Sequence, residues 1–183
     1  MRKYLLIVLL SAVTLPAIAQ KGSTLLYGSL GYQYMENSPF GGSGSIFSIN
    51  PGIGYGLSDR WTAGVNLTFR LYNGHYESTS FGAGPFVRYT RPLSEMFSVF
   101  GQFDAGYSIE KVEGNQQTKT LTMALFPAIE MNIKNGFALN FSMGGLDFTS
   151  GSSAGIPGSS KSFSIQFGSS ANFGVSKRFG VKK

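Results

Sequence analysis

The amino-acid sequence predicts an all-β protein, an eight-stranded antiparallel up-and-down transmembrane β-barrel. A period-two alternation of apolar and small polar residues recurs about eight times, over roughly ten residues each time, the length of a membrane-spanning strand. Turn-forming residues separate these segments, and the connections alternate between short turns and longer polar loops. The polar face is mostly Gly, Ser, Thr and Asn rather than Lys and Glu, which suits the inside of a narrow tube. The apolar face is therefore expected to point outward, toward lipid.

The alternation is clearest at residues 61–72. One face carries Trp61, Ala63, Val65, Leu67, Phe69 and Leu71. The opposite face carries Thr62, Gly64, Asn66, Thr68, Arg70 and Tyr72. Successive side chains of a strand point to opposite faces, so this segment is a strand with one apolar face and one polar face.

The same pattern places the other strands in order along the chain. Strands are expected at residues 25–36, 45–57, 61–72, 79–90, 97–109, 119–133, 137–149 and 162–179. Short turns are expected at 58–60, 91–95 and 134–136, and longer loops at 37–44, 73–78, 110–118 and 150–160. Asn135-Gly136 favours a type I′ hairpin turn, and Gly144-Gly145 predicts a bulge because the alternation slips there.

Three prolines do not suit a regular ladder. Pro51, Pro85 and Pro127 fall at outward positions of three strands, each about six residues before the next short turn. Proline cannot donate to a strand ladder and is rare inside a sheet. The shared position indicates a repeated hairpin design whose physical reason the sequence does not give.

The N-terminus has the features of a secretory signal. Arg2 and Lys3 precede an apolar run at residues 4–10, and Ala17-Ile18-Ala19 forms an A-x-A cleavage site. We expect a signal peptide at residues 1–19 and one barrel domain at 20–183, exported to the cell outer membrane. Partners expected there are outer-membrane lipids, lipopolysaccharide and, during biogenesis, the barrel assembly machinery.

Composition argues against several other functions. Basic residues are not concentrated on a helix or an aromatic-rich loop, so no nucleic-acid partner is expected. The chain has no cysteine and one histidine, which leaves no basis for predicting a disulfide, a metal site or a cofactor.

One constellation raises the possibility of catalysis. His75, the single histidine, lies near Glu77 and Ser78 in a polar loop, the residue types of a hydrolase such as a lipid A deacylase. A nucleophile needs a base that is held by a third group on a rigid support, and a short polar loop offers little support. The expectation is a solvated loop histidine and no catalytic residue.

Two neighbouring segments carry a resemblance. FGAGPFVRY at residues 81–89 and FSVFGQFDAGY at 97–107 resemble the small outer-membrane β-barrel domain proteins common in Bacteroidetes, often called porin-family or OmpX/OmpW-like. The resemblance covers nearly the whole mature chain and implies a barrel rather than an activity. NFGVSKRF at 172–179 resembles the assembly signal of such barrels, but Lys177 stands where an apolar residue is expected.

Several charged and aromatic residues have inward parity, which means that they fall at the alternate strand positions whose side chains point into the barrel. The charged set is Arg70, Arg88, Asp104 and Glu130, and the aromatic set is Phe86, Phe100 and Phe126. Unpaired charges in a narrow lumen are costly, so we expect structural ion pairs, Arg88 with Glu130 and Arg70 with Asp104, with partner exchange inside this set left open. The phenylalanines are expected to plug the remaining space, because side chains can fill an eight-stranded barrel.

Taken together, the sequence predicts a non-enzymatic integral outer-membrane barrel with a structural or surface-interaction role and a plugged polar lumen. The first alternative is a small passive diffusion pore, favoured if the four lumen charges line an ion path. The second alternative is an outer-membrane enzyme that modifies lipid A. The sequence identifies no ligand for the extracellular loops.

Overall fold

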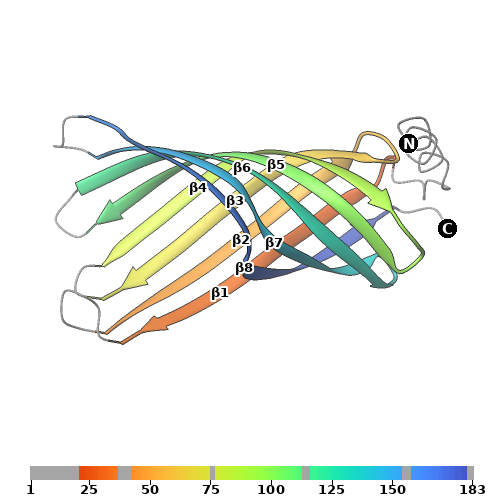
Figure 1. The fold of residues 1–183 in the computed structure, drawn as a ribbon, viewed down its shortest axis with the longest axis horizontal. Coiled ribbons are helices and arrows are strands. Elements are labelled where there is room, and N and C mark those ends of the chain that lie inside the picture. The colour runs from red at the N-terminus through yellow and green to blue at the C-terminus, as the bar shows by residue number, and fades with distance from the viewer. Residues whose placement is uncertain (1–20, 37–42, 75–76, 113–115, 154–157, 181–183) are drawn as a thin grey trace, which may run out of the picture.

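The computed structural model describes residues 21–36, 43–74, 77–112, 116–153 and 158–180, and all their regular structure is β-strand. The strands are β1 (Thr24–Met35), β2 (Gly44–Gly56), β3 (Trp61–Asn73), β4 (Ser78–Pro92), β5 (Phe97–Val112), β6 (Gln116–Lys134), β7 (Phe137–Ser153) and β8 (Ser160–Phe179). Each strand pairs antiparallel with the next, and β8 returns to β1 to close an eight-stranded barrel (Figure 1). The predicted fold class is confirmed.

The barrel carries apolar side chains on its outside. Leu30, Trp61, Val65 and Phe81 point outward and are between 47% and 68% exposed. The buried apolar residues are few and lie inside: Leu25, Phe86, Phe100, Ala128 and Ala138. This is the reverse of a water-soluble barrel, and it confirms that the apolar face of each strand points outward.

The two ends of the barrel differ. The short turns after β2, β4 and β6 lie at the end that both chain termini approach (Figure 1), which we call the short-turn end; the opposite end is the loop end. At the last short turn, Asn135 and Gly136 have φ values of 53° and 76°, as a type I′ turn requires, so that prediction is confirmed. The Asn135 and Gly136 pair can adopt this geometry because both residue types tolerate positive φ.

The strands on one side of the barrel run further toward the loop end than the sequence predicts. β5 extends to Val112, β6 begins at Gln116 and β7 extends to Ser153, so much of the predicted loops 110–118 and 150–160 is strand. Polar cross-strand pairs continue the ladder there: the Thr118 and Ser153 hydroxyls are 2.8 Å apart, and Ser78 donates to Glu110 at 2.8 Å. The polar composition was a poor guide because such pairing does not need apolar residues.

The three prolines mark a repeated break in the ladder. Each is exposed on the outer face and keeps its pairing with the preceding strand: Pro51 with Gly28, Pro85 with Val65, and Pro127 with Gly101. Toward the following strand, pairing stops for two residues at each proline, without a register shift at Pro51 and Pro85 and with a one-residue shift at Pro127. The missing proline N–H explains why the break always lies on the same side.

A larger irregularity lies between β7 and β8. Their register moves from Ser142 opposite Asn172 to Gly144 opposite Phe167, so β8 carries extra residues there. Gly144 and Gly168 have φ values of 96° and 75°, which glycine adopts readily. The bulge predicted at Gly144 is confirmed, and its larger part is on β8.

The described residues contain no helix long and apolar enough to cross a membrane. The predicted signal peptide and its cleavage site lie outside the described residues.

Candidate functional site

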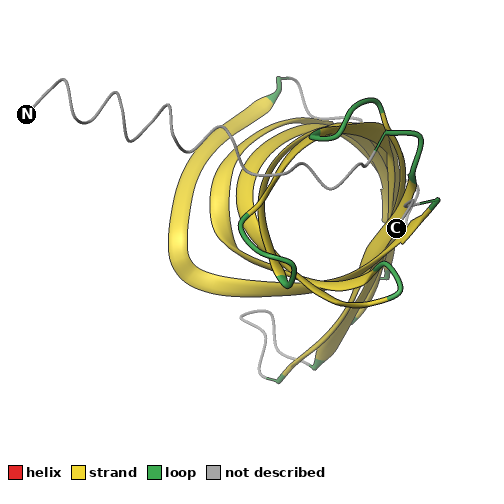
Figure 2. Ribbon diagram, turned by 90° about the vertical axis from the view of Figure 1, so that its right-hand side faces the viewer, coloured by secondary structure: helices red, strands yellow, loops and turns green. Residues whose placement is uncertain are grey.

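The lumen of the barrel contains a cavity of about 720 Å³. Figure 2 views the barrel from the short-turn end and shows its strands arranged in a ring. The walls combine small polar residues with a few charged and aromatic ones, among them Tyr27, Asn66, Arg88, Phe100, Gln102 and Asp104. Asn140 of β7 also lines the cavity.

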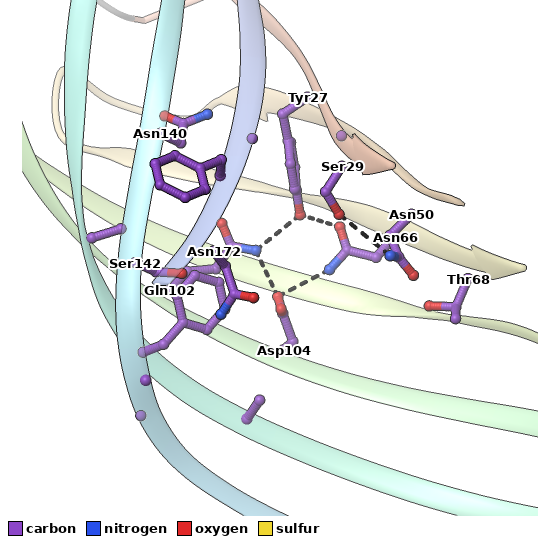
Figure 3. A pocket seen from close by; sticks show the side chains of 18 of the residues that line it. Tyr27, Ser29, Asn50, Asn66, Thr68, Gln102, Asp104, Asn140, Ser142 and Asn172 are labelled. Carbon is purple, nitrogen blue, oxygen red and sulfur yellow. Dashed lines mark hydrogen bonds between the residues drawn. The ribbon is translucent and has the colours of Figure 1, made fainter. Parts of the chain in front are cut away.

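A hydrogen-bonded network crosses this cavity (Figure 3). The Tyr27 hydroxyl donates to the side-chain carbonyl of Asn66, and the Asn66 amide donates to Asp104 at 3.0 Å. The Gln102 amide donates to the Tyr27 oxygen at 2.9 Å and to the same Asp104 oxygen at 2.8 Å. Strands β1, β3 and β5 are thereby joined across the lumen by side chains alone.

Arg88 forms the centre of a buried cluster below this network, toward the short-turn end. Its side chain is 2% exposed, and its Nε donates to Gln102 at 2.7 Å. Its Nη1 lies 3.7 Å from Glu130 Oε2, so the structure brings together the predicted pair. The guanidinium also lies over the rings of Phe100 and Tyr27, at 4.0 and 4.6 Å from their centroids.

Arg178, near the end of β8, is a third member of this cluster. Its Nη2 lies 3.8 Å from the same Glu130 oxygen, and both side chains are more than nine-tenths buried. Glu130 therefore compensates two arginines, and the three groups together carry one net positive charge. Because charges out of water are costly when unpaired, the carboxylate of Glu130 is the critical member.

The three phenylalanines predicted to point inward lie in the lumen near Arg88. Phe86 and Phe100 are 1% and 4% exposed, and Phe126 packs edge-on against Phe100 with centroids 6.5 Å apart. Phe86 meets the Tyr27 ring in a similar arrangement at 5.2 Å. Phe100 and Phe126 line the cavity together with Arg88.

The predicted pairing of Arg70 with Asp104 is wrong. Arg70 is exposed and forms no ion pair within the described residues, whereas Asp104 accepts hydrogen bonds from Asn66 and Gln102. The ladder places Arg70 level with Ser80 and Glu110, near the loop end. Counting residues from the turns ignores the stagger between strands, and a residue near the open end is solvated without a partner.

Three residues of the site were missed by the sequence analysis: Tyr27, Gln102 and Arg178. All have inward parity, since Gln102 alternates with Phe100 and Asp104, and Arg178 precedes the outward Phe179. The alternation could have placed them in the lumen, but only the closure of β8 on β1 brings Arg178 beside Glu130. Tyr27 follows Leu26, which is 41% exposed, so its inward position was available from the alternation.

Lys177 occupies an outward position for a physical reason. Its ammonium group donates to the Asn135 carbonyl in the last short turn and lies 4.0 Å from the centroid of the Phe137 ring. The Phe179 ring lies on its other side, at 5.6 Å. A lysine near a membrane interface can cover apolar surface with its stem and place its charge at the polar edge.

The constellation considered for a hydrolase, for which no catalytic role was expected, lies only partly within the described residues. His75 lies outside the described residues, and the Ser78 hydroxyl donates to Glu110 on the neighbouring strand. The part of the chain that the structure describes has no group of three or more His, Cys, Asp or Glu side chains able to hold a metal ion.

Comparisons with known proteins support the fold. No family model matches the sequence, and no curated protein matches it. Among solved structures, the outer membrane protein OprG from Pseudomonas aeruginosa is similar, with a TM-score of 0.52 and 9% sequence identity over 87% of this chain and 97% of that chain. At this identity the similarity is one of fold: both chains form an outer-membrane type of β-barrel.

Proposed function

We propose that this protein is a non-enzymatic outer-membrane β-barrel with a structural or surface-interaction role, and that its lumen is blocked at the short-turn end. The observation that carries the proposal is the buried cluster of Arg88, Glu130 and Arg178, enclosed by Phe86 and Phe100. Buried polar residues also occupy this end, including Thr62, Thr90, Ser98 and Ser176. An eight-stranded lumen filled in this way leaves little room for a continuous water path.

The proposed orientation follows from the connections. Short turns face the periplasm in barrels of this kind and longer loops face the outside, so the loop end would face the cell exterior. The outward apolar belt would contact outer-membrane lipids, and the loop end would face lipopolysaccharide. Insertion by the barrel assembly machinery and a place among OmpX/OmpW-like barrels belong to the same proposal.

The second candidate function is a small passive pore, and the cavity itself favours it. A space of about 720 Å³ with polar walls can hold water or a small solute. Whether solute passes depends on the cluster around Arg88.

We expect the wild-type protein to show no stable conductance in a planar bilayer, because the cluster closes the short-turn end. Replacing Phe100 and Phe86 together with alanine should produce measurable openings, since two buried rings next to Arg88 are removed. The Phe81→Ala variant is a control, because Phe81 is 56% exposed on the outer face and should not affect the lumen. Steady wild-type conductance would replace the blocked barrel with the passive pore.

The membrane location is tested separately. The mature protein should fractionate with outer membranes and migrate differently on gels before and after boiling, because the backbone hydrogen bonds between its strands resist detergent. Its N-terminal sequence should begin at Gln20, and lipid A from expressing cells should be unchanged. Recovery from the soluble periplasm would contradict the location, and a modified lipid A would favour the enzyme instead.

A further inference from the structure

The wall of the barrel is weakest where its first and last strands meet. β1 and β8 pair from Thr24 opposite Phe179 to Gly28 opposite Val175, and the described pairing stops there. β1 continues to Met35 with β2 on one side, and residues 160–167 of β8 continue with β7 on one side. Each strand therefore has one unpaired edge in the loop half of the barrel; we call these the β1 edge (residues 29–35) and the β8 edge (residues 160–167).

The side chains along these edges are unusually uncovered. On the outer face Leu30 and Tyr32 are each 68% exposed, and Phe163 is 64% exposed. Leu121 and Met123, on the outer face of β6 with paired strands on both sides, are each 38% exposed. Outer-face residues paired on both sides range up to 56% at Phe81 and 59% at Val175, so the two edges lie at the exposed end of this range.

Unpaired edges are costly in lipid. No water in the bilayer core satisfies backbone N–H and C=O groups, so a strand edge there needs another strand. Soluble proteins protect edges with charged residues and proline. The β1 edge contains neither, and the β8 edge contains one charged residue, Lys161. Both sequences therefore lack protection against strand addition.

The opening between the β1 edge and the β8 edge also reaches the polar lumen. The cavity is lined by residues 28–31 of β1 and by Asn172, Phe173 and Gly174 of β8, which face one another across the opening. Ser29 is held by the Asn50 amide at 3.3 Å (Figure 3). An added strand would separate this polar interior from lipid.

We propose that the two edges form an interface with a second copy of this chain, the β1 edge of each copy pairing with the β8 edge of the other. β1 and β8 run in opposite directions, so a two-fold axis along the membrane normal pairs them antiparallel twice. One symmetric contact then satisfies both edges of both copies, whereas a different partner would need two separate strands. This inference rests on the membrane location proposed above.

The chain has no cysteine, so disulfide formation between engineered cysteines tests the interface. Two differently tagged copies are co-expressed, one with Tyr32→Cys and the other with Phe163→Cys, Ile165→Cys or Phe167→Cys. Oxidation of isolated outer membranes should give a mixed-tag dimer for at least one combination. Tyr32→Cys alone should give none, and neither should Leu67→Cys with Leu121→Cys, on strands away from the edges.

A blocking variant completes the test. Gln33→Lys places an inward-pointing charge on the β1 edge and should remove most of the mixed-tag dimer. Thr122→Lys is the matched control, because Thr122 has inward parity on β6 but is paired on both sides. This control should leave the dimer unchanged. Both variants should still fractionate with outer membranes.

The outcomes separate the alternatives. One chain can also carry both Tyr32→Cys and Ile165→Cys. A disulfide within that chain, without a mixed-tag dimer, would mean that β1 and β8 of one copy pair with each other, and it would overturn the proposal. No disulfide of either kind would also overturn it and would leave the opening facing lipid. Loss of the protein from the membrane fraction would instead overturn the proposed function.

Discussion

Glu130→Ala is expected to destabilise the barrel by about 3–5 kcal/mol, because it removes the carboxylate that lies within ion-pair distance of two buried arginines. Glu130 Oε2 lies 3.7 Å from Arg88 and 3.8 Å from Arg178, and the Glu130 side chain is 2% exposed. After the substitution, two cations would face each other in the lumen. Urea-induced unfolding of the barrel in liposomes measures the free energy of unfolding.

The same experiment includes variants that separate lost charge from lost packing. Arg88→Ala/Glu130→Ala should be less destabilised than the sum of the two single variants, because the second substitution removes an orphaned charge. Glu110→Ala is the matched control, since Glu110 is half-buried near the loop end and accepts a hydrogen bond from Ser78. It should cost about 1 kcal/mol or less. Equal losses for Glu130→Ala and Glu110→Ala would mean that the buried cluster does not stabilise the barrel.

The fold could be predicted from the sequence because the residues of each strand indicate which of its two faces points inward. In β3, the alternation from Trp61 to Tyr72 sorts the side chains into two faces, and the small polar residues on one of them identify it as the inner face. The Asn135-Gly136 turn is equally local, since both residue types permit positive φ. Information of this kind does not depend on long-range contacts.

The site could be predicted only in part, because the position of an inward side chain along the barrel axis depends on the stagger between strands. Parity placed Arg88, Glu130 and Asp104 inside, and the structure brings Arg88 to Glu130. Arg70 was assigned the wrong partner because its position along the barrel axis was counted in residues from a turn. The strand pairing places it level with Glu110 instead. The role of Arg178 depends on closure of the barrel, a contact between the two ends of the chain.

The prolines show the same limit. Pro51 was recognised as an outward residue in a strand, but the side on which it interrupts the ladder depends on which neighbour its missing N–H would have faced. That direction depends on which residue pairs of the hairpin are hydrogen-bonded and which are not. Local alternation does not define this. A repeat of proline at equivalent positions predicts a repeated break without giving its side.

Val65→Arg is expected to cost about 2–4 kcal/mol, because it places a charge on the outer face near the middle of β3, where the proposed membrane is most apolar. Val65 is 47% exposed on the outside and lies between Ile53 and Pro85 in the sheet. The free energy of unfolding from liposomes is the measurement.

The matched control is on the same strand and the same face. Leu71→Arg lies two residues before the end of β3, where the side chain reaches the interface, and should cost about 0–1 kcal/mol. Val65→Leu should be close to neutral, because it keeps an apolar group against lipid. The expected result is thus a cost that depends on depth along one strand. If both arginine variants cost the same small amount, water surrounds the outside of the barrel at both levels, and neither the membrane location nor the proposed dimer interface can hold.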